Sequence, residues 1–515
     1  MYSNPTVVVE KQLKIEHGKD SKDCRVVLTK EWLTWALEEN SGAVDKGPKD
    51  IPPLSAYSDI VRVRVSWVLK TDVSQVSEES DDQGQSKLDV HYAVRISKPE
   101  HRSDLSLTKI TFLGTKEACE DISQAVKEEI SQRVPRRPKS LLVIINPASG
   151  KGSAEQVYRK HGAPIFELCG IKTDVQVTKR AKHSDEILDK YDLTTIDGVV
   201  AVGGDGTLTE VVNALLKRTM KDAGIDENDP DVVPKTPSVT CGMFPGGSAN
   251  GNPLYVGYSK QPSSIAIMIA IGHSEMLDVM TIHCGKQFLA YGLLMLGYGQ
   301  MARVMGIMED NRWAGPARYL ALPFCLLLKR KLVNLEVEYL PADTTSSESS
   351  STTPNQGTAS PVEGATCNSD LSWKKVSGMY LGVDAVSIHP SAPNYDKPFF
   401  AHQAINDGKL RLWLSKECGR MEQVSFFNKL KKYDHTAFDV NFLECYEVKA
   451  FKIRAVNPKP DDKASRLLIW DGDMLQSPEP HAEIRNHHHI VHFFTRDDGE
   501  ELRQAYLAKV QAEKS

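Results

Sequence analysis

The middle of the chain, residues 140–275, alternates short apolar runs with amphipathic segments. The runs 141–145 and 198–202 are apolar at every position but one glycine, as in parallel strands whose two faces are both buried. The second run leads into a segment with apolar residues at helical spacing, namely Leu208, Val211, Val212, Leu215 and Leu216. Strands that alternate with helices in this way predict an α/β fold, with a parallel sheet and helices on both of its faces.

The regions on either side follow a strand-like pattern. Residues 1–131 contain alternating stretches, such as 60–65 and 88–94, before an amphipathic segment at 115–131. They predict a small β-rich module closed by one helix, either of pleckstrin-homology type or of another small α+β type. Beyond residue 276, strand-like stretches recur at 331–339, 376–383, 409–415, 446–454, 466–471 and 488–494. These stretches predict an antiparallel β-sandwich domain that extends to residue 497.

Some segments lack both patterns. Residues 132–139 form a basic linker interrupted by prolines, which fits either a solvated hinge or a contact with acidic lipid headgroups. Residues 341–370 are rich in Ser and Thr and nearly devoid of large apolar side chains, so we expect a disordered insertion there. Residues 498–515 are expected to form a C-terminal tail. The histidine run 487–489 is too short to indicate a metal site and is expected to be exposed polar surface.

The composition narrows the classes of partner. The 515 residues carry a net charge of −5, so no overall positive field would attract nucleic acid. The 9 cysteines form no CxxC pair, which favours reduced thiols over a disulfide framework or a zinc site. The first residues lack the apolar core of a signal peptide, and no run of about 18 apolar residues predicts a transmembrane helix. We therefore expect a cytoplasmic protein whose membrane contacts are peripheral and reversible.

The most informative turn is Gly203-Gly204-Asp205-Gly206-Thr207, between the apolar run 198–202 and the predicted helix. Glycines let the backbone approach an anion closely, and the free N–H groups of a helix start attract phosphate. A carboxylate in the same turn is repelled by phosphate unless a cation or a reacting proton accompanies it. This arrangement predicts phosphoryl transfer.

Two further turns of small residues follow predicted strands. One is Asn-Pro-Ala-Ser-Gly-Lys-Gly-Ser at 146–153, and the other is Pro-Gly-Gly-Ser-Ala-Asn-Gly at 245–251. Each alone is a weak signal, because ordinary loops also use glycine. Because the carboxyl ends of parallel strands meet at one edge of a sheet, the three turns together predict a ligand site at that edge.

In these three turns the chain resembles the lipid kinase superfamily of diacylglycerol, ceramide and sphingosine kinases. The segments Asn-Asp-Gly-Lys-Leu at 406–410 and Asp-Gly-Asp at 471–473 agree with that pattern. The segments 309–318 and 442–451 are most similar to the eukaryotic sphingosine and ceramide kinases. The resemblance covers about two-thirds of the chain. It implies an α/β nucleotide-binding domain at 140–275, then a β-sandwich lipid-binding domain at 276–497, with the active site between them.

The resemblance also implies roles for single residues. Asp205 would be the general base that takes the proton of the lipid's primary hydroxyl as that oxygen attacks the γ-phosphate of ATP. Asp473 would also help to bind Mg²⁺. The positions that match nucleotide-binding residues of the family are Asn146, Ser149, Gly150, Lys151, Gly152, Thr178, Gly203, Gly204, Gly206, Thr207, Gly247, Ser248, Asn250, Glu309, Arg312, Arg318, Asp471, Gly472 and Asp473. The two arginines suit phosphate oxygens, although surface ion pairs would use the same residues.

One departure from the family concerns the lipid headgroup. In sphingosine kinases the position of Met305 holds an acid that helps to recognise the amino group of the substrate, and Arg303 replaces another frequent acid. A methionine cannot pair with an ammonium group, so the departure favours ceramide or another neutral lipid unless another acid, such as Asp310, takes this role.

A second family feature concerns the acyl chain and the membrane. In the family the apolar segment 319–328 forms a lid over the acyl-chain pocket and touches the membrane, and a basic run follows it here. An ordinary buried helix would show the same pattern. The expected lipid-binding residues are Met305, Leu320, Leu322, Phe324 and Leu327.

The function that these features favour is an ATP- and Mg²⁺-dependent kinase for the primary hydroxyl of a sphingoid lipid, either sphingosine or ceramide. A diacylglycerol kinase and a catalytically silent lipid-binding scaffold of the same fold remain alternatives. A soluble-metabolite kinase of NAD-kinase type shares Gly-Gly-Asp-Gly-Thr, but the apolar lid and the segment 312–318 argue against it. We expect a peripheral membrane surface as a partner, and the sequence does not predict the oligomeric state.

Overall fold

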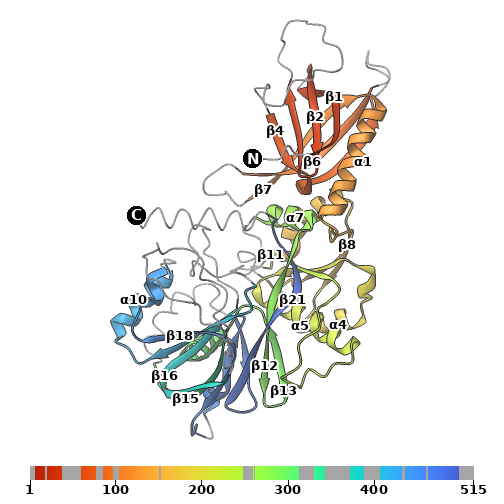
Figure 1. Ribbon diagram of the computed structural model, residues 1–515. Helices are drawn as coiled ribbons and strands as arrows, with labels where there is room; N and C mark the ends of the chain where they lie inside the picture. Colours follow the sequence, from red (N-terminus) through yellow and green to blue (C-terminus); the bar gives the residue numbers. More distant parts are fainter. Residues whose placement is uncertain are drawn as a thin grey trace, which may run out of the picture.

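The structure is a computed structural model of the whole chain (Figure 1). It describes residues 6–17, 20–37, 60–76, 85–96, 104–149, 152–246, 259, 261–311, 330–342, 372–387, 406–431, 435–459 and 462–497. The expected lid at 319–328, nearly all of the expected insertion at 341–370, and the expected tail at 498–515 lie outside the described residues.

The N-terminal module is a seven-stranded antiparallel sheet with one long helix. The order across the sheet is β4-β3-β2-β1-β7-β6-β5. The strands are β1 (Val7–His17), β2 (Asp20–Thr29), β3 (Trp32–Leu37), β4 (Ile60–Arg64), β5 (Val68–Gln75), β6 (Ser86–Arg95) and β7 (Leu105–Gly114). Helix α1 (Lys116–Arg133) begins at Thr115, whose side chain accepts a hydrogen bond from the N–H of Ala118. The prediction of a β-rich module is therefore confirmed, and its pleckstrin-homology character stays a prediction.

The α/β region contains a parallel sheet in the order β11-β10-β8-β9. Its strands are β8 (Ser140–Ile145), β9 (Lys172–Val177), β10 (Gly198–Gly203) and β11 (Thr240–Pro245). The helices are α2 (Ala154–His161), α3 (Ala163–Leu168), α4 (His183–Lys190), α5 (Asp205–Asp222) and α7 (Pro262–Ile271). Alternate residues of β8 face opposite layers. Val143 belongs to the core that α2, α3 and α7 share with the N-terminal module, whereas Ile144 belongs to the core beneath α4 and α5. The predicted α/β region with helices on both faces is confirmed.

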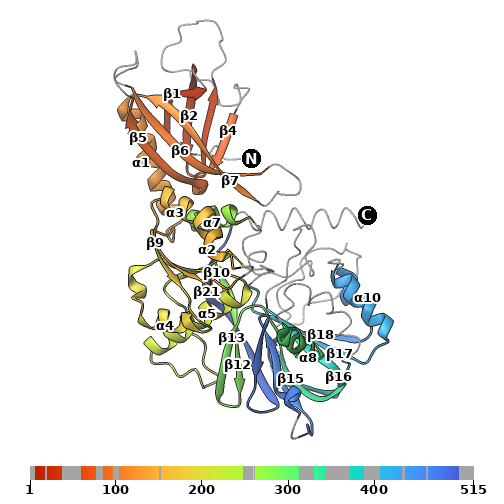
Figure 2. The same cartoon turned by 180° about the vertical axis from the view of Figure 1, so that it is seen from behind.

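The C-terminal region is built from antiparallel strands that continue the same sheet. Its strands are β12 (Ser274–Cys284), β13 (Gln287–Gly292), β14 (Met295–Gly299), β15 (Val333–Pro341), β16 (Lys374–Val386), β17 (Leu410–Lys416), β18 (Leu443–Ala455), β19 (Leu467–Trp470), β20 (Asp473–Gln476) and β21 (His481–Phe494). Strand β21 pairs with β11, β12 and β18 and so joins the two regions (Figure 1). Helix α8 (Gln300–Asp310) lies on this sheet, and α10 (Arg420–Lys431) lies beside it (Figure 2). The antiparallel pairing agrees with the sequence pattern, and the sandwich form stays a prediction.

Arg137 of the basic linker fits neither of the two expectations for this segment, a solvated hinge or a contact with lipid headgroups. Its guanidinium donates hydrogen bonds to the backbone carbonyls of Ile271, Val68 and Ser66, at 2.9, 2.8 and 2.5 Å. Burial lowers the pKa of Arg137 to about 10. Arg137 is therefore neither a solvated hinge residue nor a lipid contact. It fixes the N-terminal module to the α/β region.

The histidine run also differs in part from its expectation. His488 and His489 are exposed, but His487 is buried, and its Nε2 is 3.0 Å from the hydroxyl of Thr281. The strand is irregular at this point: His489 has a positive φ of 58°, and the register between β12 and β21 shifts beside it, so two consecutive side chains face outward after the buried His487. Separately, none of the described helices has the length and apolar character needed to cross a membrane.

Candidate active site

The turn around Asp205 joins strand β10 to helix α5. The strand ends at Gly203, Gly204 is the N-cap residue, and Asp205 is the first residue of the helix. Gly204, at the N-cap position, has no side chain with which to cap this helix. The N–H of Thr207 donates to the carbonyl of Gly204 at 3.0 Å, and the helix dipole favours negative charge at this end.

Thr207 links this turn to the one that follows β8. Its hydroxyl oxygen accepts a hydrogen bond from Nδ2 of Asn146 at 3.1 Å and lies 3.3 Å from the hydroxyl of Ser149. Gly203 makes this approach possible. A Cβ atom there would lie 2.4 Å from the Thr207 hydroxyl and 2.9 Å from the Ser149 hydroxyl. The first two glycine-containing turns are thus brought together at one edge of the sheet.

The third turn begins at the same edge. The N–H of Gly246 donates to the carbonyl of Gly203 at 2.9 Å. On the opposite side, Thr178 follows β9 and is buried, and its N–H donates to the carbonyl of Ile145 at 2.8 Å. Gly152 has a positive φ of 76°, which glycine adopts without strain. The expected nucleotide-binding residues outside the described part are Gly150, Lys151, Gly247, Ser248, Asn250, Arg312 and Arg318.

The C-terminal hairpin between β19 and β20 reaches the start of α5. A Cβ atom on Gly206 would lie 3.2 Å from Oδ2 of Asp473. Asp473 is partly exposed, and it stands beside the helix turn that carries Asp205. Two carboxylates from segments more than 260 residues apart are therefore placed next to the proposed phosphate cradle.

Asp471 holds that hairpin in place. Its Oδ1 accepts hydrogen bonds from the N–H groups of Leu294 and Met295, at 2.8 and 3.0 Å. Its Oδ2 accepts from the N–H of Leu293 at 2.7 Å and from the hydroxyl of Thr209 at 3.3 Å. The side chain is buried, which raises the pKa of Asp471 to about 6 against the opposing effect of these hydrogen bonds.

The backbone of the hairpin also has an unusual conformation. Asp471 has a φ of +47° and Gly472 a φ of +89°. Aspartate tolerates the left-handed region better than most residues, and glycine adopts it freely. The Asp-Gly-Asp sequence thus makes a tight turn whose first carboxylate faces inward and whose second faces α5.

Helix α8 carries the positions expected to bind lipid and nucleotide. Met305 is half-buried on α8, and Glu309 lies one turn later on the same helix. Gly306 packs near Leu467 and Met474, which shows that this helix covers the hairpin strands β19 and β20. The other expected lipid-binding residues, Leu320, Leu322, Phe324 and Leu327, lie outside the described residues.

Sequence reasoning missed an acid that organises the Asn406-Asp407-Gly408 turn. Asp278 is buried in β12, and its Oδ2 accepts from the N–H of Gly408 at 2.8 Å. Its Oδ1 lies 3.0 Å from Nδ1 of His488. An aspartate inside the otherwise apolar stretch 276–280 was the available signal, because an acid is retained in a buried strand only with partners.

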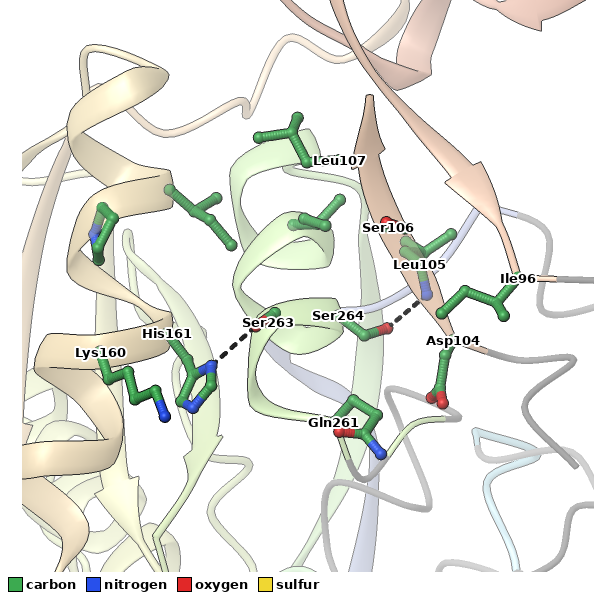
Figure 3. Close-up of a pocket in the computed structure, with 13 residues that line it drawn as sticks. Ile96, Asp104, Leu105, Ser106, Leu107, Lys160, His161, Gln261, Ser263 and Ser264 are labelled. Carbon is green, nitrogen blue, oxygen red and sulfur yellow. Dashed lines mark hydrogen bonds between the residues drawn. The ribbon is translucent and has the colours of Figure 1, made fainter. Parts of the chain in front are cut away.

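A separate pocket lies between the N-terminal module and the α/β region (Figure 3). It has a volume of about 470 Å³. On one side Ser264 accepts a hydrogen bond from the N–H of Leu105 at 2.9 Å, and on the other Ser263 lies 3.0 Å from Nδ1 of His161. It contains none of the glycine-turn residues, so it is distinct from the candidate site.

Comparisons with known proteins found similar sequences and a similar solved structure. The family described as "Diacylglycerol kinase catalytic domain" matches residues 140–282. Human ceramide kinase is 26% identical over 482 residues, which cover 85% of this chain and 89% of that protein. Sphingosine kinase 1 of Arabidopsis thaliana is 30% identical over 362 residues, covering 66% of this chain and 69% of that protein. A putative diacylglycerol kinase from Bacillus anthracis str. Sterne, a solved structure, is similar over 70% of this chain and 98% of that one, with a TM-score of 0.47 and 16% identity.

Proposed function

Because the chain belongs to the lipid kinases that share the diacylglycerol kinase catalytic domain and include the ceramide and sphingosine kinases, we propose that it phosphorylates the primary hydroxyl of a sphingoid lipid. The observation that carries this proposal is the position of Asp205. It is the first residue of α5, at the helix start where the glycine turns meet. A base in that position would stand beside a phosphate bound at the helix start.

In the proposed reaction Asp205 accepts the proton of the lipid hydroxyl as its oxygen attacks the γ-phosphate of ATP. Phosphoryl transfer requires mainly positioning and neutralisation of charge, so one well-placed base suffices on the protein side. The hydroxyls of Ser149 and Thr207 and the amide of Asn146 offer polar groups to the phosphates, together with the N–H groups that open α5.

Mg²⁺ would be held by few protein groups. Among the described residues no cluster of three His, Cys, Asp or Glu side chains could hold a metal ion by itself. A magnesium ion needs only one or two carboxylates when phosphates and waters complete its shell, and Asp473 beside Gly206 fits that requirement. The ion would neutralise charge on the phosphates.

Ceramide is the favoured substrate within this class. Met305 stands where sphingosine kinases carry the acid for the amino headgroup, and it is half-buried on α8. An uncharged amide does not need that acid. Sphingosine and diacylglycerol remain the alternatives, and a catalytically silent scaffold is the alternative from another class.

We also propose that the protein is cytoplasmic and binds membranes reversibly, because its substrate resides in a bilayer. The apolar segment 319–328 followed by basic residues is the part of the sequence that fits such contact.

The direct test is transfer of labelled γ-phosphate from ATP to ceramide, sphingosine and diacylglycerol in mixed micelles, with Asp205→Asn as the matched variant. We expect product on ceramide and a loss of at least a hundredfold in kcat for Asp205→Asn, with ATP binding retained. Product on sphingosine alone would contradict the headgroup argument. Equal turnover by Asp205→Asn would contradict its role as base.

A further inference from the structure

Asp384 is an acid inside an apolar row of the C-terminal sheet. It lies on β16, opposite Gly297 of β14 on one side and Trp413 of β17 on the other. Ile469 of β19 is opposite Gly297 in turn. Residues that pair directly across antiparallel strands share one face of the sheet, so Asp384 stands between apolar neighbours on that face.

The absence of a side chain at Gly297 leaves room for the carboxyl group. A Cβ atom on Gly297 would lie 2.7 Å from Oδ1 of Asp384 and 3.6 Å from Cβ of Met301 in the first turn of α8. Asp384 therefore lies beneath α8, the helix that also carries Met305. Met301 and Met305 are four residues apart and share a helix face.

One oxygen of the Asp384 carboxyl is buried without a partner in the described part of the chain. This atom, Oδ1, is shielded from solvent and makes no hydrogen bond with any residue that the structure describes. Leaving a buried polar atom unpaired costs about 1–3 kcal/mol, so such atoms are rare unless something else uses them.

Asp384 is buried in part only. Burial raises the pKa of Asp384 to about 7, so the carboxyl group is poorly solvated. The residue as a whole nevertheless keeps intermediate exposure, although Oδ1 itself is shielded. Part of the side chain therefore stays accessible from outside the packed sheet.

The distance to the phosphate cradle indicates which part of a lipid would reach Asp384. Asp473 lies on β20, and β19 and β14 separate that strand from β16. With neighbouring strands about 4.8 Å apart, the two strands are about 14 Å apart. A sphingolipid is long enough to span this distance. Its reacting hydroxyl, held at the phosphates, would not reach Asp384, whereas groups further along the lipid would.

We infer that Asp384 accepts a hydrogen bond from the bound lipid, from an amide N–H or a hydroxyl other than the one phosphorylated, and so favours lipids that carry such a donor. This inference rests on the proposed lipid kinase function and adds a residue that sets its substrate class. Ceramides carry donors of both kinds, whereas diacylglycerol has none besides its reacting hydroxyl. A site built to pair with a polar group rejects the analogue that lacks it, because the protein group is then left unpaired.

The test uses the full chain and three lipids with matched acyl chains: a ceramide, a ceramide with a 2-hydroxylated acyl chain, and diacylglycerol. We would measure kcat/KM for the wild type, Asp384→Leu and Asp384→Asn, with Glu338→Gln as a control that removes a carboxylate on the neighbouring strand. We expect Asp384→Leu to lower kcat/KM at least tenfold for the ceramides and less than twofold for diacylglycerol, with KM for ATP unchanged. Asp384→Asn keeps an acceptor oxygen and should lose less than threefold.

The ceramide arms identify the donor. An equal loss on both ceramides assigns the donor to the shared amide and sphingoid hydroxyl, and a larger loss on the 2-hydroxylated lipid assigns it to the acyl chain. A uniform loss on all three lipids, or an unchanged ratio between ceramide and diacylglycerol, would overturn the inference.

Binding of the same lipids from vesicles, measured without ATP, separates the inference from the proposed function. Weaker binding of ceramide but not of diacylglycerol by Asp384→Leu supports the inference even if turnover is absent. A wild type that binds ceramide with this preference but phosphorylates no lipid would contradict the kinase proposal alone. Identical binding by wild type and Asp384→Leu would overturn the inference.

Discussion

The carboxylate of Asp473 packs against Gly206, so that a Cβ atom on the glycine would lie only 3.2 Å from Oδ2. Gly206 belongs to the first turn of α5, and Asp473 opens the strand β20. A segment near the end of the described chain thus adds a carboxylate to the candidate site. It depends on Asp471, whose buried carboxylate ties the same hairpin to the backbone of residues 293–295.

Asp473 is predicted to act on metal and phosphate rather than on folding. Asp473→Asn keeps the shape of the side chain but removes its charge. We expect kcat to fall at least tenfold at low Mg²⁺ and to recover partly as Mg²⁺ is raised, with an unchanged Tm, because a weakened metal ligand is compensated by mass action. Kinase assays across a Mg²⁺ series check this. Glu479→Gln, an exposed change in the same C-terminal region, is the control. A loss that Mg²⁺ does not alter would contradict the metal role.

The space at Gly203 is predicted to be essential for the phosphate cradle. In Gly203→Ala the new methyl group would lie 2.4 Å from the Thr207 hydroxyl, closer than real atoms approach. Thr207 or the turn at Ser149 must therefore move. We expect KM for ATP to rise at least tenfold, measured by initial rates.

The matched control is Gly378→Ala in β16, where the nearest atom to the new methyl group is 3.4 Å away in the ring of Tyr380. We expect it to leave KM for ATP within twofold of the wild type. If Gly203→Ala bound ATP normally, the cradle would not include this turn.

Much of this arrangement could be predicted from the sequence because its signals are local. The run 198–202 is buried on both faces, and the glycine turn follows it directly, so strand, turn and helix start are readable in a single stretch. That the turns meet follows from a general property of parallel sheets.

The remainder depends on contacts between distant residues. The sequence Asp471-Gly472-Asp473 gives no sign that one carboxylate is turned inward onto residues 293–295 while the other faces α5. Arg137 stands in a basic linker that looks solvated, yet its partners are carbonyls of two other segments. Asp384 interrupts an apolar strand, and only the pairing with Gly297 shows where its carboxyl lies.

Arg137 is predicted to stabilise the junction between the N-terminal module and the α/β region. Arg137→Ala removes three hydrogen bonds from a charged donor and leaves the carbonyls of Ser66, Val68 and Ile271 without it. A bond from a charged donor contributes about 1.5–3 kcal/mol, and three bonds that share one guanidinium do not add fully, so we expect the free energy of unfolding to fall by about 3–5 kcal/mol. Urea unfolding measures the change. Arg136→Ala, the exposed neighbour, should differ from wild type by less than about 0.5 kcal/mol, and equal effects of the two variants would refute the role.

His487 is predicted to make the protein less stable in mild acid. Burial lowers the pKa of His487 to about 4, with smaller contributions from Arg485 and His283, whereas the unfolded chain has the ordinary value of 6.5. Between these values the unfolded chain binds more protons, so the contribution of His487 is complete above pH 6.5 and is lost as the pH falls toward 4. From pH 7.5 to pH 5 this loss is about 2 kcal/mol.

Other acids also titrate in this range, so the test compares the pH dependence of the wild type with that of a variant. His487→Gln has no such titration and can still bond with Thr281. Urea unfolding at the two pH values should show the wild type losing about 2 kcal/mol more than His487→Gln between them. Parallel losses in the two proteins would show that His487 is not held neutral by its surroundings.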